Sequence, residues 1–156
     1  MVYIDYKNKI LVRKKILKIS VIIPTFNREE HLNNCLSYLL TQTKKPFEIL
    51  VIDNSDDSYA KKIINNLENQ FKKQNVFVYC FKNSVNSGAI ARNLGASKAK
   101  GDLIAFLDDD VLLDSNYYEE IEKVFLKYPD ALGVHGYNKV ANKAYQEIKD
   151  SFLYSL

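Results

Sequence analysis

Three consecutive aspartates, Asp108, Asp109 and Asp110, are the residues of this chain whose spacing points most directly to chemistry. They follow an apolar run at 103–107, which is typical of a buried strand. Adjacent like charges repel, so carboxylates at a strand end need a compensating cation or bulk water. Mg²⁺ and Mn²⁺ favour oxygen ligands, and Mg²⁺ commonly uses one or two carboxylates together with substrate phosphates. The triplet therefore predicts either a metal that holds a diphosphate or a solvated acidic turn.

The elements that must position the triplet alternate along the chain. Strands are expected at 19–23, 48–52, 76–81 and 103–107, with a further strand at 131–136. Stretches with apolar residues at helical spacing follow the first four strands, and the last of these helices is expected at about 115–128. This alternation predicts an α/β fold with a mostly parallel sheet and helices on both faces.

Polar loops follow three of the expected strands, at residues 25–28, 53–58 and 108–110. Ligands of parallel sheets bind beyond the carboxyl ends of the strands. Three loops that converge at one rim favour a binding site over three unrelated turns.

Four segments resemble glycosyltransferase family 2, whose members have the Rossmann-like GT-A fold. Residues 19–28 are similar to its opening strand and loop, and residues 49–55 to its second strand. Residues 86–95 are similar to its donor-site helix, and residues 101–110 to the strand that carries its DxD metal motif. The resemblance implies an apparently truncated GT-A fold and transfer of a sugar from a nucleotide-diphosphate sugar.

The resemblance also implies roles for single residues. Asp53 would accept a hydrogen bond from the base, most simply the N3–H of uracil, so a UDP-sugar is the expected donor. Arg92 would neutralise the donor phosphates or brace the acidic cluster, and Gly88 would let the donor approach the backbone. Asp108 and Asp110 would reach the ribose and the metal, Mg²⁺ or Mn²⁺. The residues expected to bind the nucleotide sugar are Thr25, Asn27, Arg28, Asp53, Ser55, Gly88, Arg92, Asp108 and Asp109, with Asp108 and Asp110 as metal ligands.

Ordinary structural roles stay open for four of these residues. Asp53 can cap the next helix, and Asn27 can be the N-cap of the first helix, in a capping box with Glu30. Arg92 can form a salt bridge on a helix surface, and Gly88 can be a simple helix-start glycine.

A catalytic base is expected to be absent from this chain. In the family, an Asp or Glu on a segment after the fifth strand takes the acceptor proton, and transfer inverts the anomeric centre. Here the carboxylates after that strand are Glu147 and Asp150, whose spacing is typical of surface charge, and His135 is expected in the core or at its rim. The chain is therefore expected to bind a donor but to transfer sugar poorly, and its acceptor (a saccharide, a lipid-linked molecule or a protein) is unknown.

The 156 residues are expected to form one main domain at 19–140, preceded by a basic arm or edge strand at 1–18 and followed by an amphipathic tail at 141–156. A net charge of +3 gives little support for nucleic-acid binding. The basic arm and the apolar face of the tail are compatible with peripheral membrane contact or with a homo-oligomer.

The two cysteines, Cys35 and Cys80, form no disulfide framework. No signal peptide or membrane-spanning run is evident in the sequence. A cytoplasmic location is expected, including the inner face of the membrane.

Three alternatives compete with a transferase. A non-catalytic nucleotide-sugar-binding fragment stays open because the base is missing. A nucleotidyltransferase would usually need a glycine-rich, basic phosphate loop where residues 25–28 lie, and these residues lack it. A phospho-receiver domain would need an acidic pair in the same place, and the loop contains no Asp.

Overall fold

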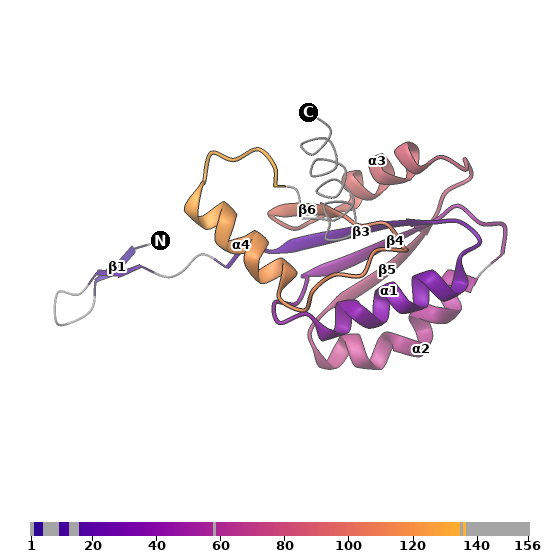
Figure 1. The fold of residues 1–156 in the computed structure, drawn as a ribbon, viewed down its shortest axis with the longest axis horizontal. Coiled ribbons are helices and arrows are strands. Elements are labelled where there is room, and N and C mark those ends of the chain that lie inside the picture. Colours follow the sequence, from indigo (N-terminus) through magenta and orange to yellow (C-terminus); the bar gives the residue numbers. More distant parts are fainter. Residues whose placement is uncertain (1, 5–9, 13–15, 58, 135, 137–156) are drawn as a thin grey trace, which may run out of the picture.

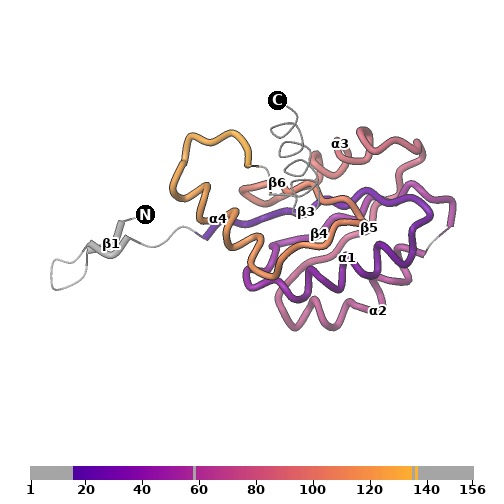
Figure 2. The backbone as a smooth tube through the Cα atoms, in the orientation of Figure 1, coloured from indigo at the N-terminus to yellow at the C-terminus, as the bar shows by residue number. Residues whose placement is uncertain are grey.

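The computed structural model describes residues 2–4, 10–12, 16–57, 59–134 and 136 of the chain (Figure 2). The elements, in chain order, are β1 (Val2–Ile4), β2 (Ile10–Val12), β3 (Ile19–Thr25), α1 (Glu29–Thr41), β4 (Glu48–Asp53), α2 (Tyr59–Lys73), β5 (Phe77–Lys82), α3 (Gly88–Lys98), β6 (Leu103–Phe106) and α4 (Tyr117–Lys127). The expected carboxylates Glu147 and Asp150, together with His135 and the tail at 141–156, lie outside the described residues.

The main sheet has four parallel strands in the order β5-β4-β3-β6 (Figure 1). β3 and β4 are the central strands, and nearly all of their residues are buried, as parallel strands covered on both faces require. This confirms the predicted mostly parallel sheet. Strands β1 and β2 form a separate antiparallel pair.

Helices cover both faces of this sheet (Figure 1). On one face, Val21 and Ile23 of β3 join a core with apolar residues of α1 and α2 and with Tyr118 of α4. On the other face, Ile22 packs with Ala91 of α3. Side chains alternate between the two faces of a strand, so neighbouring residues of β3 belong to different cores.

Glycine allows α3 to approach the sheet closely. A Cβ atom on Gly95 would lie 2.4 Å from Cγ2 of Ile22. This short distance fixes the height of α3 above β3, and α3 carries Gly88 and Arg92 at its first turns.

Two local predictions differ from the structure. Asn27 is not the N-cap of α1: Arg28 holds that position without a side-chain cap bond, and Asn27 has a φ of 52°. Asparagine tolerates this left-handed conformation, which turns the chain between β3 and α1. The strand expected at 131–136 is not formed by the described residues 131–134 and 136.

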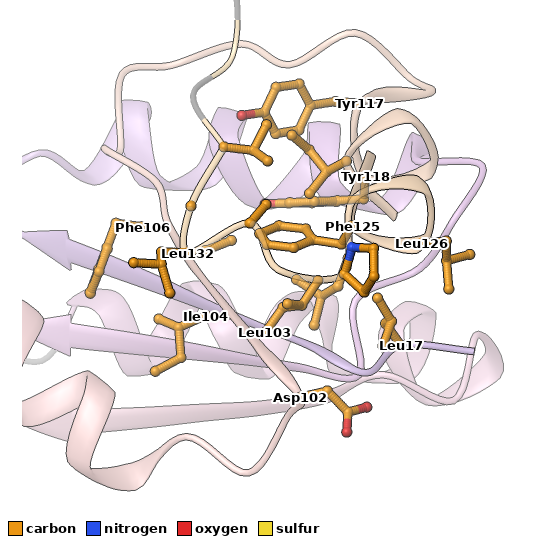
Figure 3. A pocket seen from close by; sticks show the side chains of 17 residues that line it. Leu17, Asp102, Leu103, Ile104, Phe106, Tyr117, Tyr118, Phe125, Leu126 and Leu132 are labelled. Carbon is orange, nitrogen blue, oxygen red and sulfur yellow. The ribbon is translucent and has the colours of Figure 1, made fainter. Parts of the chain in front are cut away.

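An apolar hollow of about 940 Å³ lies between β6, α4 and the segment after α4. Figure 3 shows Leu103, Tyr118 and Phe125 around it, with Asp102 at its margin. Asp102 is at the start of β6, where its Oδ2 accepts a hydrogen bond from the backbone N–H of Lys18. The hollow is therefore large, but few polar side chains line it.

No helix in the described part of the chain is long and apolar enough to cross a membrane.

Candidate functional site

A smaller pocket of about 260 Å³ opens at the carboxyl ends of the parallel strands. Its lining residues come from four segments of the chain: Pro24, Thr25, Phe26, Arg28, Asn54, Asn86, Gly88, Arg92, Asp108, Asp109 and Asp110. The structure thus brings seven of the ten predicted site residues to one pocket, and three of them, Asn27, Asp53 and Ser55, do not line it.

The three aspartates have different environments. The side chains of Asp108 and Asp110 are 56% and 44% exposed, whereas that of Asp109 is only 4% exposed. Asp109 Oδ2 accepts a hydrogen bond of 2.8 Å from the hydroxyl of Thr25, which lies at the end of β3. The middle carboxylate therefore ties the triplet to the central strand, and the outer two face the pocket and solvent.

Arg28 joins two members of the triplet. Its Nη1 donates to Asp109 Oδ1 and to Asp110 Oδ2, at 2.9 Å in each case. The hydrogen bond that Arg28 donates to Asp110, followed by the negative charge of Asp109, raises the pKa of Arg28 above its ordinary value. The guanidinium therefore stays protonated between the two carboxylates.

Arg92 neutralises the third carboxylate from the opposite side of the pocket. Its Nη2 pairs with Asp108 Oδ1. A Cβ atom on Gly88, one turn earlier in α3, would lie 3.0 Å from Arg92 Nη1, so glycine leaves room for the guanidinium. Ser87 caps this helix, and its hydroxyl accepts a bond from the N–H of Ile90. Gly88 is therefore a helix-start residue that also makes space for Arg92.

Asp53 and Ser55 form a second polar layer beside the pocket. Asp53 Oδ1 accepts a hydrogen bond from the N–H of Ser55 at 2.9 Å, and Asp53 Oδ2 lies 3.8 Å from Nζ of Lys82. The hydroxyl of Ser55 accepts a bond from the N–H of Asn27 at 2.8 Å. At the start of α2, the N–H of Tyr59 donates to Asp57 Oδ1 at 3.3 Å.

Sequence reasoning missed three residues that hold the site together. The hydroxyl of Tyr59 lies 2.8 Å from that of Thr25. Asn83 donates to Asn54 Oδ1 at 2.6 Å, and Asn54 donates to the carbonyl of Thr25. The only sequence signal that could have indicated Asn54 and Asn83 was the presence of polar residues after the expected second and third strands.

A family comparison agrees with this geometry. The sequence model of the family described as Glycosyl transferase family 2 matches residues 20–154. The chain belongs to this family of glycosyltransferases. The predicted resemblance to glycosyltransferase family 2 is therefore confirmed.

Similar proteins support both the family and the fold of the chain. An uncharacterized glycosyltransferase of Rickettsia conorii is 38% identical over 142 residues, which cover 88% of this chain and 22% of the relative. The structure of S. aureus TarS 1-349 with UDP has a TM-score of 0.61 and 23% identity, covering 76% of this chain and 38% of that one. The structure of GalNAc-T7 with UDP, GalNAc and Mn²⁺ has a TM-score of 0.58 and 28% identity, and the match covers 72% of this chain and 21% of GalNAc-T7.

These structures are GT-A glycosyltransferases, which confirms the predicted GT-A fold. The chain spans between 14% and 40% of the length of eight curated relatives that it matches.

Proposed function

We propose that this glycosyltransferase binds a nucleotide-diphosphate sugar, most simply a UDP-sugar, in the pocket at the ends of β3 and β6. The observation that carries the proposal is the pairing of three carboxylates with two arginines in one open pocket. Guanidinium groups suit phosphate recognition, because their planar fork matches phosphate oxygens. TarS binds UDP and GalNAc-T7 binds UDP with GalNAc and Mn²⁺, and both share this fold.

The nucleotide base would lie over the loop that follows β4. Asp53 is buried at the end of that strand, beside the pocket residue Asn54. Its Oδ1 is already bonded to the N–H of Ser55, which leaves Oδ2, beside Lys82, as the acceptor for a uracil N3–H. Thr25 lines the pocket, Asn27 would support the loop beside the base through its bond to Ser55, and Gly88 would allow close approach of the diphosphate.

A divalent cation, Mg²⁺ or Mn²⁺, would bind the exposed carboxylates Asp108 and Asp110. The residues fit such an ion: Arg28 Nη1 already contacts one oxygen each of Asp109 and Asp110 at 2.9 Å, so a positive charge is accommodated there. Among the described residues, no group of three or more His, Cys, Asp or Glu is placed to hold a metal ion by itself. Mg²⁺ typically needs one or two carboxylates plus phosphates, so the donor would complete the ligand set. The ion would neutralise charge on the departing nucleotide diphosphate.

Transfer also needs an acceptor hydroxyl and a base within about 3 Å of it. We propose an inverting transfer, as the family resemblance implies, to an acceptor that is still unknown. A cytoplasmic location, including the inner membrane face, stays a prediction from the cysteine content. A membrane contact and a homo-oligomer stay predictions as well.

Calorimetry with UDP, in Mn²⁺ and in EDTA, tests the proposed donor site. We expect the metal to increase affinity and Asp110→Ala to remove that increase. Asp102→Ala is the matched control, because it removes the same side chain from the opposite end of β6. Equal affinity in Mn²⁺ and in EDTA would count against the metal.

The alternative is a nucleotide-sugar-binding protein without transferase activity. Measuring donor hydrolysis and sugar transfer separately from donor binding distinguishes the two. Binding without either reaction favours the alternative, and transfer to any hydroxyl acceptor refutes it.

A further inference from the structure

Arg28 and a divalent cation would compete for the same carboxylate oxygen. Arg28 Nη1 contacts Oδ1 of Asp109 and Oδ2 of Asp110. Asp109 is buried and its other oxygen is bonded to Thr25, so its position is fixed. Asp110 is 44% exposed and Arg28 is 46% exposed, which leaves this pair free to separate. A cation that takes Asp110 Oδ2 as a ligand must displace the guanidinium from that atom.

A diphosphate would offer Arg28 a replacement partner. Arg28 lines the same pocket as Gly88 and Arg92, which lie across from it on α3. Hydrogen bonds from a guanidinium to phosphate are charge-assisted and are among the stronger polar contacts. The Arg28 side chain can therefore exchange a carboxylate for a phosphate while its backbone stays at the N-cap of α1.

We propose that Arg28 is an exchangeable counterion that couples metal binding to donor binding. It pairs with Asp110 in the protein alone, and it moves to the donor diphosphate when the metal takes Asp110. This inference rests on the proposed function, because it requires a diphosphate and a cation in one pocket.

The coupling follows from the number of times that the Arg28–Asp110 pair must break. The metal alone breaks the pair, and the donor alone also breaks it. The two ligands together break it only once. Each ligand should therefore bind more tightly in the presence of the other, and by the same factor in both directions.

The affinity of the protein alone for Mn²⁺ is the decisive measurement, by calorimetry or by EPR of free Mn²⁺. Arg28→Gln should bind Mn²⁺ about 1.5- to fivefold more tightly than the wild type, the range expected when an exposed ion pair no longer competes. With UDP present, the coupling factor in Arg28→Gln should be smaller by about the same ratio. Arg28→Lys keeps the positive charge but not the planar fork, so its Mn²⁺ affinity should lie between those of the wild type and Arg28→Gln. This variant tests the inference if Arg28→Gln does not fold.

Lys123→Gln is the matched control. The Lys123 ammonium also bridges two carboxylates, Glu119 and Glu120, at 3.0 and 2.7 Å, but on the exposed side of α4. Its loss should leave Mn²⁺ affinity unchanged.

The outcomes separate this inference from the proposed function. Unchanged or weaker Mn²⁺ affinity in a folded Arg28→Gln variant, with normal UDP binding by the wild type, would overturn the inference alone. An equal increase of Mn²⁺ affinity in Lys123→Gln would show that the effect comes from net charge alone, and this would also overturn the inference. Failure of the wild type to bind UDP with or without Mn²⁺ would refute the proposed function together with the inference.

Discussion

Asp109→Ala should destabilise the protein, whereas Asp110→Ala should leave its stability nearly unchanged. The two residues are neighbours in one acidic triplet, but Asp109 is 4% exposed and Asp110 is 44% exposed. Asp109 joins the loop after β6 to Thr25 at the end of β3. The pair of substitutions therefore separates a structural carboxylate from one that faces the pocket.

The magnitude follows from the hydrogen bond that is lost. A bond between a hydroxyl and a buried carboxylate contributes roughly 1.5–3 kcal/mol. Removing the buried charge offsets part of this, and the Thr25 hydroxyl keeps its contact with Tyr59, so a loss of about 2 kcal/mol is expected. For a chain of this size that corresponds to a fall in Tm of roughly 4–8 °C. Asp110→Ala, an exposed substitution, should change the free energy of unfolding by about 0.5 kcal/mol or less.

Urea denaturation followed by circular dichroism measures both variants, with Asp130→Ala as an exposed control on the loop after α4. Calorimetry with UDP and Mn²⁺ on the same samples should give the opposite order, with the larger loss of metal-dependent affinity in Asp110→Ala. Equal destabilisation by the two substitutions would refute the division of the triplet into one buried and two exposed roles.

Three further predictions follow from single contacts. Gly95→Ala should cost about 1–3 kcal/mol in urea denaturation, because its Cβ would lie 2.4 Å from Ile22, while Gly133→Ala, with no atom within 4 Å, should be nearly neutral. Burial, together with the nearby aspartates, raises the pKa of Cys35 to about 12. The thiol of the unfolded chain loses its proton at lower pH, so the free energy of unfolding should fall between about pH 9 and 12, by at most about 1.4 kcal/mol per pH unit. Urea denaturation across this pH range should show a smaller fall in Cys35→Ala. Asp53→Ala should weaken uridine binding measured by calorimetry but leave its dependence on Mn²⁺ unchanged, and an unaltered uridine affinity would remove Asp53 from the base site.

The strands and the convergence of their loops were predictable because apolar runs and turn residues are local signals. The runs at 19–23 and 103–107 form β3 and β6, and parallel pairing then places residues 25–28 and 108–110 side by side. The burial of Asp109 was not predicted, because Asp109 lies in the turn after β6, where its carboxylate contacts Thr25 and Arg28.

Other features of the site depend on contacts that no local pattern shows. The N-cap of α1 was predicted one residue too early, because the left-handed φ of Asn27 is set by the turn and not by residue type alone. The contact between Thr25 and Tyr59, and that between Asn54 and Asn83, joins residues far apart in the chain. Only the packed sheet brings such partners together.

Among the strands that the structure describes, β6, which the acidic triplet follows, is hydrogen-bonded to one neighbour, β3. Within the described residues, β6 pairs with β3 through four residue pairs and lies at the end of the sheet. Opening of this short edge strand would carry Asp109 away from Thr25 and would dismantle the pocket. A ligand that bridges the two loops must therefore slow the opening, since it binds only the closed form. The backbone amides of Leu103 and Leu107, which donate to the carbonyls of Lys18 and Ile22, therefore report whether the pocket is occupied, and their hydrogen exchange should slow when it is filled.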